Sequence, residues 1–253
     1  MNIHLKTEKE IQLIGIGGKI LAETLKETSK NAEAGVKLKD LDKIAFNFIK
    51  KNNAEPAFLG YHPESSKNPY NASICASVNN VIVHGFPTNY ILKDGDILKI
   101  DIGVKYRGFY SDAAITIGIG KISKTAELLI IAAKTALESA IKIARPGNTL
   151  GDIGWVIESI AQKYEFKAVK GLTGHGIGRN LHEDPIIYNF GEKGKGIKLE
   201  TGMVLAIEPM FAESTDKVIQ QPDESWATSD GSLSAHFEHT IAIINDNHII
   251  LTK

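Results

Sequence analysis

The 253-residue sequence predicts an α+β fold in which helices followed by antiparallel strands occur twice. Two internal matches indicate a duplication, because short segments of the first half recur in the same order in the second. In the stronger match, each copy is a glycine, an apolar run and a carboxylate. The matching segments are 35–41 with 147–153, and 95–101 with 202–208. We therefore expect a single domain, residues 1–253, made of two pseudo-symmetric halves at about 1–123 and 124–253.

The first half begins with a predicted helix. Thr7 and Glu10 have the spacing of a capping box, and apolar residues follow at helical intervals. Gly15, Gly17 and Gly18 count against a helix here, because glycine disfavours helical backbone. The other expected elements are a helix over 38–51, a proline-rich loop over 54–71, and strands over 73–77, 96–104 and 109–117.

The second half repeats this order. Helices are expected over 123–144 and 150–164, and strands over 203–211 and 234–244. Helices that precede strands in each half indicate a sheet with helices packed on one side.

Composition and charge exclude several classes of protein. Twenty-nine basic and thirty acidic residues leave a net charge of -1, which argues against a nucleic-acid partner. The single cysteine, Cys75, cannot form an internal disulfide and suits a reducing compartment. The polar N-terminus lacks the apolar core of a signal peptide, and no apolar run reaches the length of a membrane helix. We expect a cytoplasmic protein.

Two aspartates are expected to approach each other in the hairpin of the first half. On the strand over 97–104, Lys99 and Asp101 lie on the face opposite the apolar residues. If Tyr106 and Arg107 form the turn, Asp101 faces Asp112 directly across the hairpin. Like charges so close require a proton or a cation between them. A slipped register would instead send one aspartate to solvent.

The second half adds two carboxylates. Glu208 occupies the repeat position of Asp101, and Glu238 lies on the strand that follows. Burying four anionic groups would cost more free energy than the whole free energy of unfolding of a domain. These groups must therefore hold cations. Oxygen-rich ligation suits Mn, Fe, Co or Zn, and two such ions can share one site.

Histidines are the remaining candidates for ligands. His175 lies between glycines that permit close backbone approach, and His182 follows seven residues later. His84 ends a short apolar strand and could face the same cavity. A lone histidine is more often an ordinary core or surface residue.

At these residues the sequence resembles the type I methionine aminopeptidases of the pita-bread metallopeptidase superfamily. The resemblance extends over nearly the whole chain and implies the pita-bread fold, a duplicated antiparallel sheet with helices on its outer face. It also implies two divalent ions, Co, Mn, Fe or Zn. The metal ligands implied by the family's motifs are Asp101, Asp112, His175 in Gly-His-Gly-Ile-Gly, Glu208 before Pro-Met, and Glu238 before His-Thr.

The chemistry implied by the resemblance is hydrolysis of the first peptide bond of a chain that begins with methionine and has a small second residue. Glu208 would carry a proton, His182 would stabilise the developing oxyanion, and His84 would hydrogen-bond the scissile nitrogen. The pocket for the methionine side chain would contain Tyr61, Tyr70, Cys75 and Trp226.

The family also has a monovalent cation site, which maps to carbonyl groups of Asn79 and Val81 and to Ser234. The substrates implied are the N-termini of nascent polypeptides. The resemblance allows transient association with the ribosome and implies a monomer that binds neither nucleic acid nor membrane.

This chain departs from the family pattern in four places. The segment over 62–72 is longer than in short bacterial members, which affects the alignment of Tyr70. Phe58 and Leu181 differ from the residues common at these positions and could reshape the methionine pocket. His236 replaces an amide near the last ligand, where a third imidazole could shift the pH dependence.

Two alternatives remain at this point. A proline-specific aminopeptidase or dipeptidase of the same fold would share the ligands but generally carries a large N-terminal domain. A non-catalytic pita-bread binding module typically loses ligands, whereas this sequence keeps all five.

Overall fold

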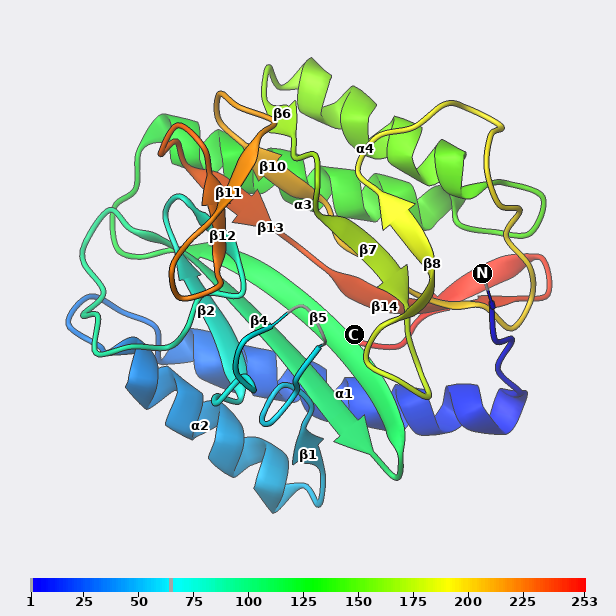
Figure 1. Ribbon diagram of the computed structural model, residues 1–253, viewed down its shortest axis with the longest axis horizontal. Helices are drawn as coiled ribbons and strands as arrows, with labels where there is room; N and C mark the ends of the chain where they lie inside the picture. Colours follow the sequence, from blue (N-terminus) through cyan, green and yellow to red (C-terminus); the bar gives the residue numbers. More distant parts are fainter. Residues whose placement is uncertain (1, 64–65) are drawn as a thin grey trace.

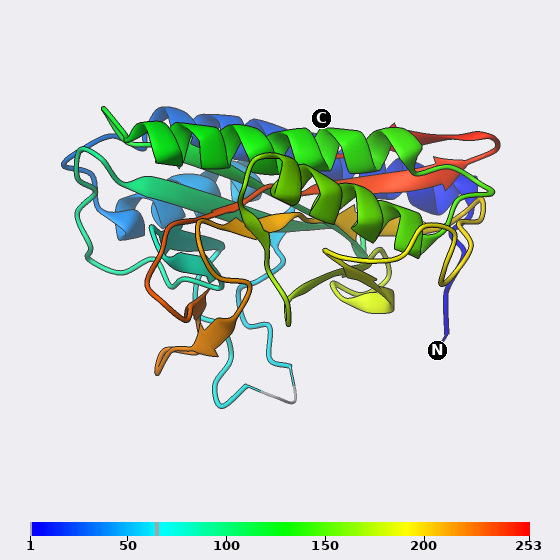
Figure 2. The same cartoon turned by 90° about the horizontal axis from the view of Figure 1, so that it is seen from above.

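Four α-helices pack against antiparallel strands in the computed structural model, which describes residues 2–63 and 66–253. The helices are α1 (Glu8–Lys30), α2 (Leu38–Lys51), α3 (Lys124–Ile143) and α4 (Leu150–Lys163). In Figure 1, α1 and α2 lie below the strands β4 and β5, and α3 and α4 lie above. Figure 2 shows α1 and α3 along one side of the molecule, with β11 and β12 projecting from the other.

The strands fall into two sequential groups. The first group is β1 (Glu55–Pro56), β2 (Ile74–Val78), β3 (Val81–Val83), β4 (Ile97–Tyr106) and β5 (Phe109–Gly118). The second group is β6 (Lys167–Ala168), β7 (Thr173–Gly176), β8 (Glu183–Tyr188), β9 (Val204–Ile207), β10 (Met210–Ala212), β11 (Val218–Gln220), β12 (Trp226–Thr228), β13 (Ser234–His236), β14 (His239–Ile244) and β15 (Asn247–Ile250). Each half therefore places two long helices before all of its described strands, as expected. The division at residue 123 stays a prediction.

Helix α1 forms despite its glycines. The Thr7 hydroxyl accepts a hydrogen bond from the Glu10 amide at 3.3 Å, which completes the predicted capping box. A Cβ atom added at Gly18 would lie 2.2 Å from the Leu251 carbonyl oxygen. Gly18 is therefore needed where the helix backbone touches the end of the chain, and this close contact outweighs the poor helical propensity of glycine.

The hairpin of β4 and β5 corrects the predicted register. Tyr106 pairs with Phe109, so the turn is Arg107 and Gly108, both with positive φ. Asp112 consequently lies opposite Gly103, two positions from the predicted partner. The shift is an even number of residues, so both aspartates still face the same side of the sheet. Direct pairing of Asp101 with Asp112 was wrong, but neither aspartate is turned to solvent.

Two long strands predicted in the second half are each interrupted. The strand over 203–211 divides into β9 and β10 at Glu208 and Pro209, where proline has no amide hydrogen for the ladder. The strand over 234–244 divides into β13 and β14, because the backbone of Glu238 between them forms hydrogen bonds with Ala114 of β5. The Glu238 amide donates to the Ala114 carbonyl at 2.9 Å, and the Ala114 amide donates back at 3.3 Å.

Each half has its own hydrophobic core against its helices. On β4 the core residues of the first half alternate with residues that face the opposite side, as predicted from the strand pattern. In the second half, α3 and α4 cover β9 and β14. The layer away from the helices is consequently free to carry polar side chains. Among the described residues, no helix combines the length and apolar character that a membrane crossing requires.

Candidate metal centre

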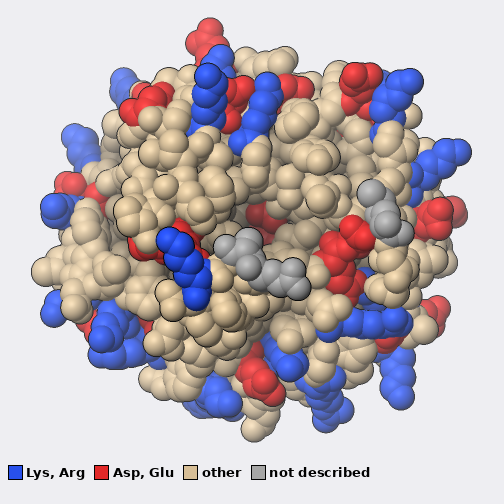
Figure 3. Space-filling model, in the orientation of Figure 1, with Lys and Arg blue, Asp and Glu red and all other residues tan. Residues whose placement is uncertain are grey.

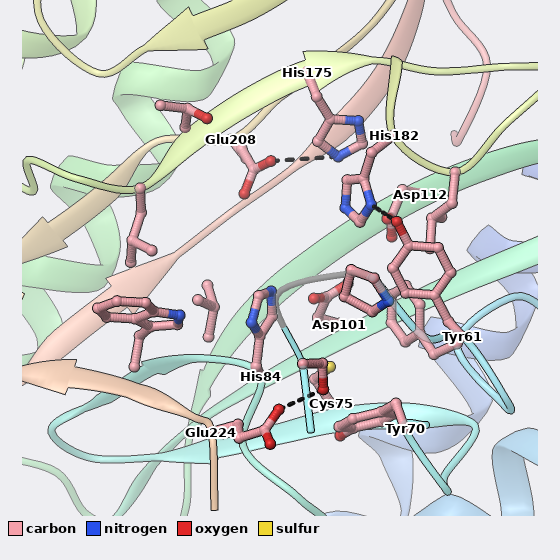
Figure 4. Close-up of a pocket in the computed structure, with 18 of the residues that line it drawn as sticks. Tyr61, Tyr70, Cys75, His84, Asp101, Asp112, His175, His182, Glu208 and Glu224 are labelled. Carbon is pink, nitrogen blue, oxygen red and sulfur yellow. Dashed lines mark hydrogen bonds and ion pairs between the residues drawn. The ribbon is translucent and has the colours of Figure 1, made fainter. Parts of the chain in front are cut away.

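A cavity of about 880 Å³ opens on the side of the sheet away from the helices. Figure 3 shows acidic side chains inside a hollow near the centre of this face. Its lining includes all five predicted ligands, which are Asp101, Asp112, His175, Glu208 and Glu238. Figure 4 shows most of these side chains directed toward one another from separate strands. The chain thus brings together residues up to 137 positions apart.

Three of these residues meet closely. One ligand atom each from Asp112, His175 and Glu238 lies within 4.8 Å of the other two. Asp112 is anchored across the two halves, because its amide donates to Thr240 Oγ1 at 2.9 Å and the Thr240 hydroxyl donates to its carbonyl at 2.7 Å. Backbone bonds to Ala114 hold Glu238 beside it. The two carboxylates are therefore fixed by bonds that cross from one half to the other.

Burial makes the ionised carboxylates unfavourable without a positive partner. Desolvation, together with the other acidic groups, raises the pKa of Asp112 and of Glu238 well above their usual range. Desolvation raises the pKa of Asp101 to about 6 and that of Glu208 to about 7. Divalent ions would remove this penalty by supplying opposite charge.

The side-chain oxygens also offer unused lone pairs. Asp101 Oδ1, Asp112 Oδ1 and Glu238 Oε1 are buried without a hydrogen-bond partner among the described residues. Buried polar atoms are rarely left unpaired, so orphaned carboxylate oxygens around one point need an explanation. Four carboxylates and one imidazole are a donor set suited to divalent transition metals. The residues present therefore fit the ions that the sequence pattern predicts.

The geometry of His175 suits a ligand through one specific nitrogen. Its Nδ1 lies 2.9 Å from the Gly176 carbonyl oxygen, so Nδ1 carries the proton and donates. Nε2 is then the free acceptor, and it lies 3.6 Å from Glu208 Oε1. A Cβ atom at Gly176 would lie 2.1 Å from the Asp184 carbonyl oxygen. Gly176 is thus required for the close contact of β7 with β8.

His236 is a second imidazole beside Glu208. Its Nε2 lies 3.3 Å from Glu208 Oε2, and the residue is only 1 % exposed. Burial lowers the pKa of His236 to about 4, although Asp101 opposes this shift. The sequence had singled out His236 as a departure from the family pattern, and the structure brings it into contact with a predicted ligand.

His84 and His182 both line the cavity, and Figure 4 shows their rings beside the acidic side chains. His84 has positive φ, so a strained backbone directs its ring. The Tyr61 hydroxyl lies 2.7 Å from His182 Nδ1. Burial raises the pKa of Tyr61, and burial with the neighbouring His175 lowers the pKa of His182 to about 3. When this hydroxyl donates to Nδ1, Nε2 of the neutral ring must carry the proton and point it toward the cavity.

The residues predicted for a side-chain pocket also line the cavity, and they are Tyr61, Tyr70, Cys75 and Trp226. Tyr70 packs edge-on against Phe58, with ring centroids 6.4 Å apart. Leu181, the other predicted departure, belongs to the same lining. Part of the long segment over 62–72, at residues 64 and 65, lies outside the described residues. Farther along this segment, the Lys67 amide donates to Glu224 Oε1 at 3.0 Å, which fastens it to the opposite rim.

The match to known proteins covers almost the whole chain. Residues 12–245 match metallopeptidase family M24. The chain belongs to this family. The predicted membership of the pita-bread metallopeptidases is confirmed.

Two relatives of this M24 chain are similar over their full length. A methionine aminopeptidase from Clostridium perfringens is 46% identical over 252 residues, which is 99% of this chain and 98% of the relative. The crystal structure of a methionine aminopeptidase from Thermotoga maritima superposes with a TM-score of 0.96 at 39% identity, covering 100% of both chains. This agreement confirms the predicted fold class.

A prolidase from Pyrococcus furiosus shares the fold alone, at 22% identity and a TM-score of 0.79. The match covers 98% of this M24 chain but 65% of the prolidase.

Lys99 does not line the cavity, but it is buried two residues from Asp101, and its contacts were not recognised from the sequence. Its side chain leaves β4 on the same face as Asp101, and it is 1 % exposed. Its Nζ donates to the Asn79 carbonyl at 2.6 Å and to the Ser234 carbonyl at 3.2 Å. Burial lowers the pKa of Lys99, and the charge of Asp96 opposes this shift. The available signal was a lysine on the same face of the strand as Asp101, a predicted metal ligand two residues away.

Proposed function

We propose that this protein is a methionine aminopeptidase that removes the N-terminal methionine from nascent polypeptides, with a preference for a small second residue. The observation that carries the proposal is that five side chains able to bind metal line one cavity, three of them with ligand atoms within 4.8 Å of one another. Full-length similarity to proteins named methionine aminopeptidase supports the same reaction. The proposal includes action in the cytoplasm, as a monomer, on chains at or near the ribosome.

The ligands divide between two divalent ions in this proposal. Asp101, Asp112, His175, Glu208 and Glu238 would hold these ions, and one ligand atom each from Asp112, His175 and Glu238 lies within 4.8 Å of the other two. Bound there, such ions lower the pKa of water toward neutrality and polarise a carbonyl group. Manganese, iron, cobalt and zinc all suit this donor set.

Glu208 is suited to move a proton. Burial raises its pKa to about 7, and the imidazoles of His175 and His236 lie 3.6 and 3.3 Å from its two oxygens. This pKa applies to the metal-free site, and a bound ion would lower it by supplying opposite charge. The proposal assigns Glu208 both as a ligand and as the proton carrier, because its two oxygens lie beside two imidazoles that can exchange a proton with it.

The two cavity histidines hold the substrate in this scheme. His182 presents Nε2–H to the oxygen that gains negative charge, with Tyr61 fixing its tautomer. His84 hydrogen-bonds the scissile nitrogen from the other side. Desolvation lowers the pKa of His84, so the ring is neutral and offers one donor and one acceptor.

The methionine side chain occupies the apolar part of the cavity. Burial keeps Cys75 and Tyr70 protonated, because it raises the pKa of both groups. The Tyr70 hydroxyl lies 3.0 Å from the Ile74 carbonyl oxygen, so it is bound to the backbone and leaves its ring for the substrate. Trp226 closes the pocket from β12, which pairs with β3 next to His84.

A peptide panel on metal-free protein tests the proposal. We expect hydrolysis of Met-Ala-Ser to appear when manganese, iron, cobalt or zinc is added, and to require a free terminal amine. Asp112→Ala should remain folded but fail to bind the ions or cleave the peptide. Acetyl-Met-Ala-Ser is the matched control and should not be cleaved.

The same panel separates the alternatives. Efficient cleavage of Xaa-Pro peptides with any first residue would favour a proline-specific enzyme. Binding of methionyl peptides without turnover, with both ions present, would favour a non-catalytic module.

A further inference from the structure

Lys99 is a buried lysine held by backbone carbonyl groups. It is among the largest side chains fully enclosed by the fold, and its Nζ contacts the carbonyl oxygens of Asn79 and Ser234. The ion pairs within the described residues do not include it. Carbonyl dipoles therefore solvate this amine in place of a carboxylate partner.

The carbonyl groups around Lys99 are fixed by the surrounding turns. Asn79 has a φ of 52°, and its side chain donates to Asp96 at 2.9 Å and accepts from the Ile97 amide at 3.0 Å. The Ser234 hydroxyl lies 3.0 Å from the Asn79 oxygen and 3.2 Å from the Val81 oxygen. The Asn79 oxygen is thus shared by the Lys99 amine and the Ser234 hydroxyl, and this hydroxyl also reaches the Val81 oxygen.

Asn79, Val81 and Ser234 are the residues to which the monovalent cation site of the family maps. An alkali ion and an alkylammonium group bind the same ligands, because carbonyl oxygens can replace the water molecules around either cation. A free cation added beside Lys99 would compete for the same lone pairs and would meet a like charge at short range. The residues present therefore do not fit a free monovalent ion.

We propose that the Lys99 ammonium group replaces the monovalent cation, so that this protein carries the positive charge as part of its own chain. The inference goes beyond the proposed function and does not depend on it, since ion binding and unfolding can be measured without turnover.

Lys99 acts as a positioning residue in this arrangement. Asn79 belongs to the first half and Ser234 begins β13 in the second, so the amine ties the halves together next to the site. β13 continues to His236, whose backbone is held by Thr116 at 2.6 and 2.9 Å, and then to Glu238. Loss of the amine should consequently displace Glu238 and His236 without removing a metal ligand.

The first test uses the unmodified, metal-loaded protein. We expect its unfolding midpoint and its kcat/KM to be the same in potassium, sodium and choline chloride at equal ionic strength. Crystals soaked in thallium(I) should show no anomalous peak beside the oxygens of Asn79, Val81 and Ser234. A thallium peak there, or an unfolding midpoint that rises with potassium but not with choline, would overturn the proposal.

The second test compares two substitutions at the same position. Lys99→Ala leaves space for an ion, whereas Lys99→Met fills the space with an apolar chain. We expect Lys99→Ala to lower kcat/KM about tenfold in choline chloride, as loss of charge-assisted hydrogen bonds would. Potassium should restore most of this loss and raise the unfolding midpoint. Lys99→Met should show a similar loss that potassium does not restore.

Two results of the second test would contradict the proposal. One is a Lys99→Ala variant with the kcat/KM and unfolding midpoint of the unmodified protein in choline chloride. The other is a loss that potassium and choline affect equally, which would indicate a packing role only. If Lys99→Ala does not fold, the thallium measurement on the unmodified protein still decides the question.

Discussion

Neutralising one buried carboxylate should stabilise the metal-free protein while it weakens metal binding. Asp101 is the most suitable position, because burial raises its pKa from 3.8 to about 6 and its Oδ1 has no hydrogen-bond partner among the described residues. The change Asp101→Asn removes the charge and keeps the size of the side chain. We expect the variant to unfold at a higher temperature than the unmodified protein when both lack metal.

The size of the effect follows from the shift in pKa. A difference of roughly two units corresponds to about 3 kcal/mol that ionisation of Asp101 costs the folded state at neutral pH. Below the unfolded pKa, near 4, this cost is absent, because the carboxyl is protonated in both states. It grows as the pH rises toward 6 and is constant above. A gain of about 3 kcal/mol corresponds to a rise of roughly 6 to 12 °C in the unfolding midpoint for a chain of this size.

Thermal unfolding in the presence of a chelator measures this prediction. The midpoint difference between Asp101→Asn and the unmodified protein should be near zero at pH 4 and reach its full value above pH 6. Asp246→Asn, in the exposed turn after β14, is the matched control and should change little at either pH. With saturating manganese the order should reverse, because the ion stabilises the form that binds it. A variant that is less stable than the unmodified protein at pH 7.5 without metal would refute the electrostatic reasoning.

Three further outcomes can be measured directly. His84→Ala should lower kcat about a hundredfold with both ions still bound, as loss of a transition-state hydrogen bond does; kinetics that match the unmodified protein, with metal content verified by mass spectrometry, would remove His84 from the mechanism. Tyr61→Phe should lower kcat about tenfold through lost control of the His182 tautomer, with little change in metal content. Gly18→Ala should reduce the free energy of unfolding by about 3 kcal/mol, since its Cβ would lie 2.2 Å from a carbonyl oxygen. Gly15→Ala, where the nearest atom is 3.6 Å away, is its control and should not destabilise the protein in urea unfolding.

The sequence was sufficient for the four helices and for the main strands of each half, but it did not predict the shorter strands β1, β6, β7, β8, β11, β12 and β15. Hydrophobic spacing and the Thr7 capping box depend on local interactions, so they can be recognised without knowledge of the fold. The glycines of α1 obscured the helix, and the one at position 18 is required by a contact with Leu251, more than 200 residues away. The helical propensities of the residues in α1 give no information about such a distant contact.

The details of the site depended on contacts between the halves. The register of β4 and β5 is set by the turn at Arg107 and Gly108. A shift by two residues leaves every side chain on the same face of the sheet, so the pattern of apolar residues could not reveal it. The break at Glu238 comes from its pairing with Ala114 in the other half. The contact of Tyr61 with His182 likewise joins residues 121 positions apart, and it has no signature in either local sequence.

The bonds between Thr240 and Asp112, and between Glu238 and Ala114, also determine when the cavity can be completed during synthesis. A growing chain presents Asp101 and Asp112 long before Glu208 and Glu238 leave the ribosome, because domains emerge from their N-terminal end. The first half supplies only two of the four carboxylates, and it lacks the bonds from Thr240 and Glu238 that position Asp112 and Ala114. The four carboxylates can therefore assemble only after Glu238 has been translated, so an ion held among them would bind after both halves have been synthesised.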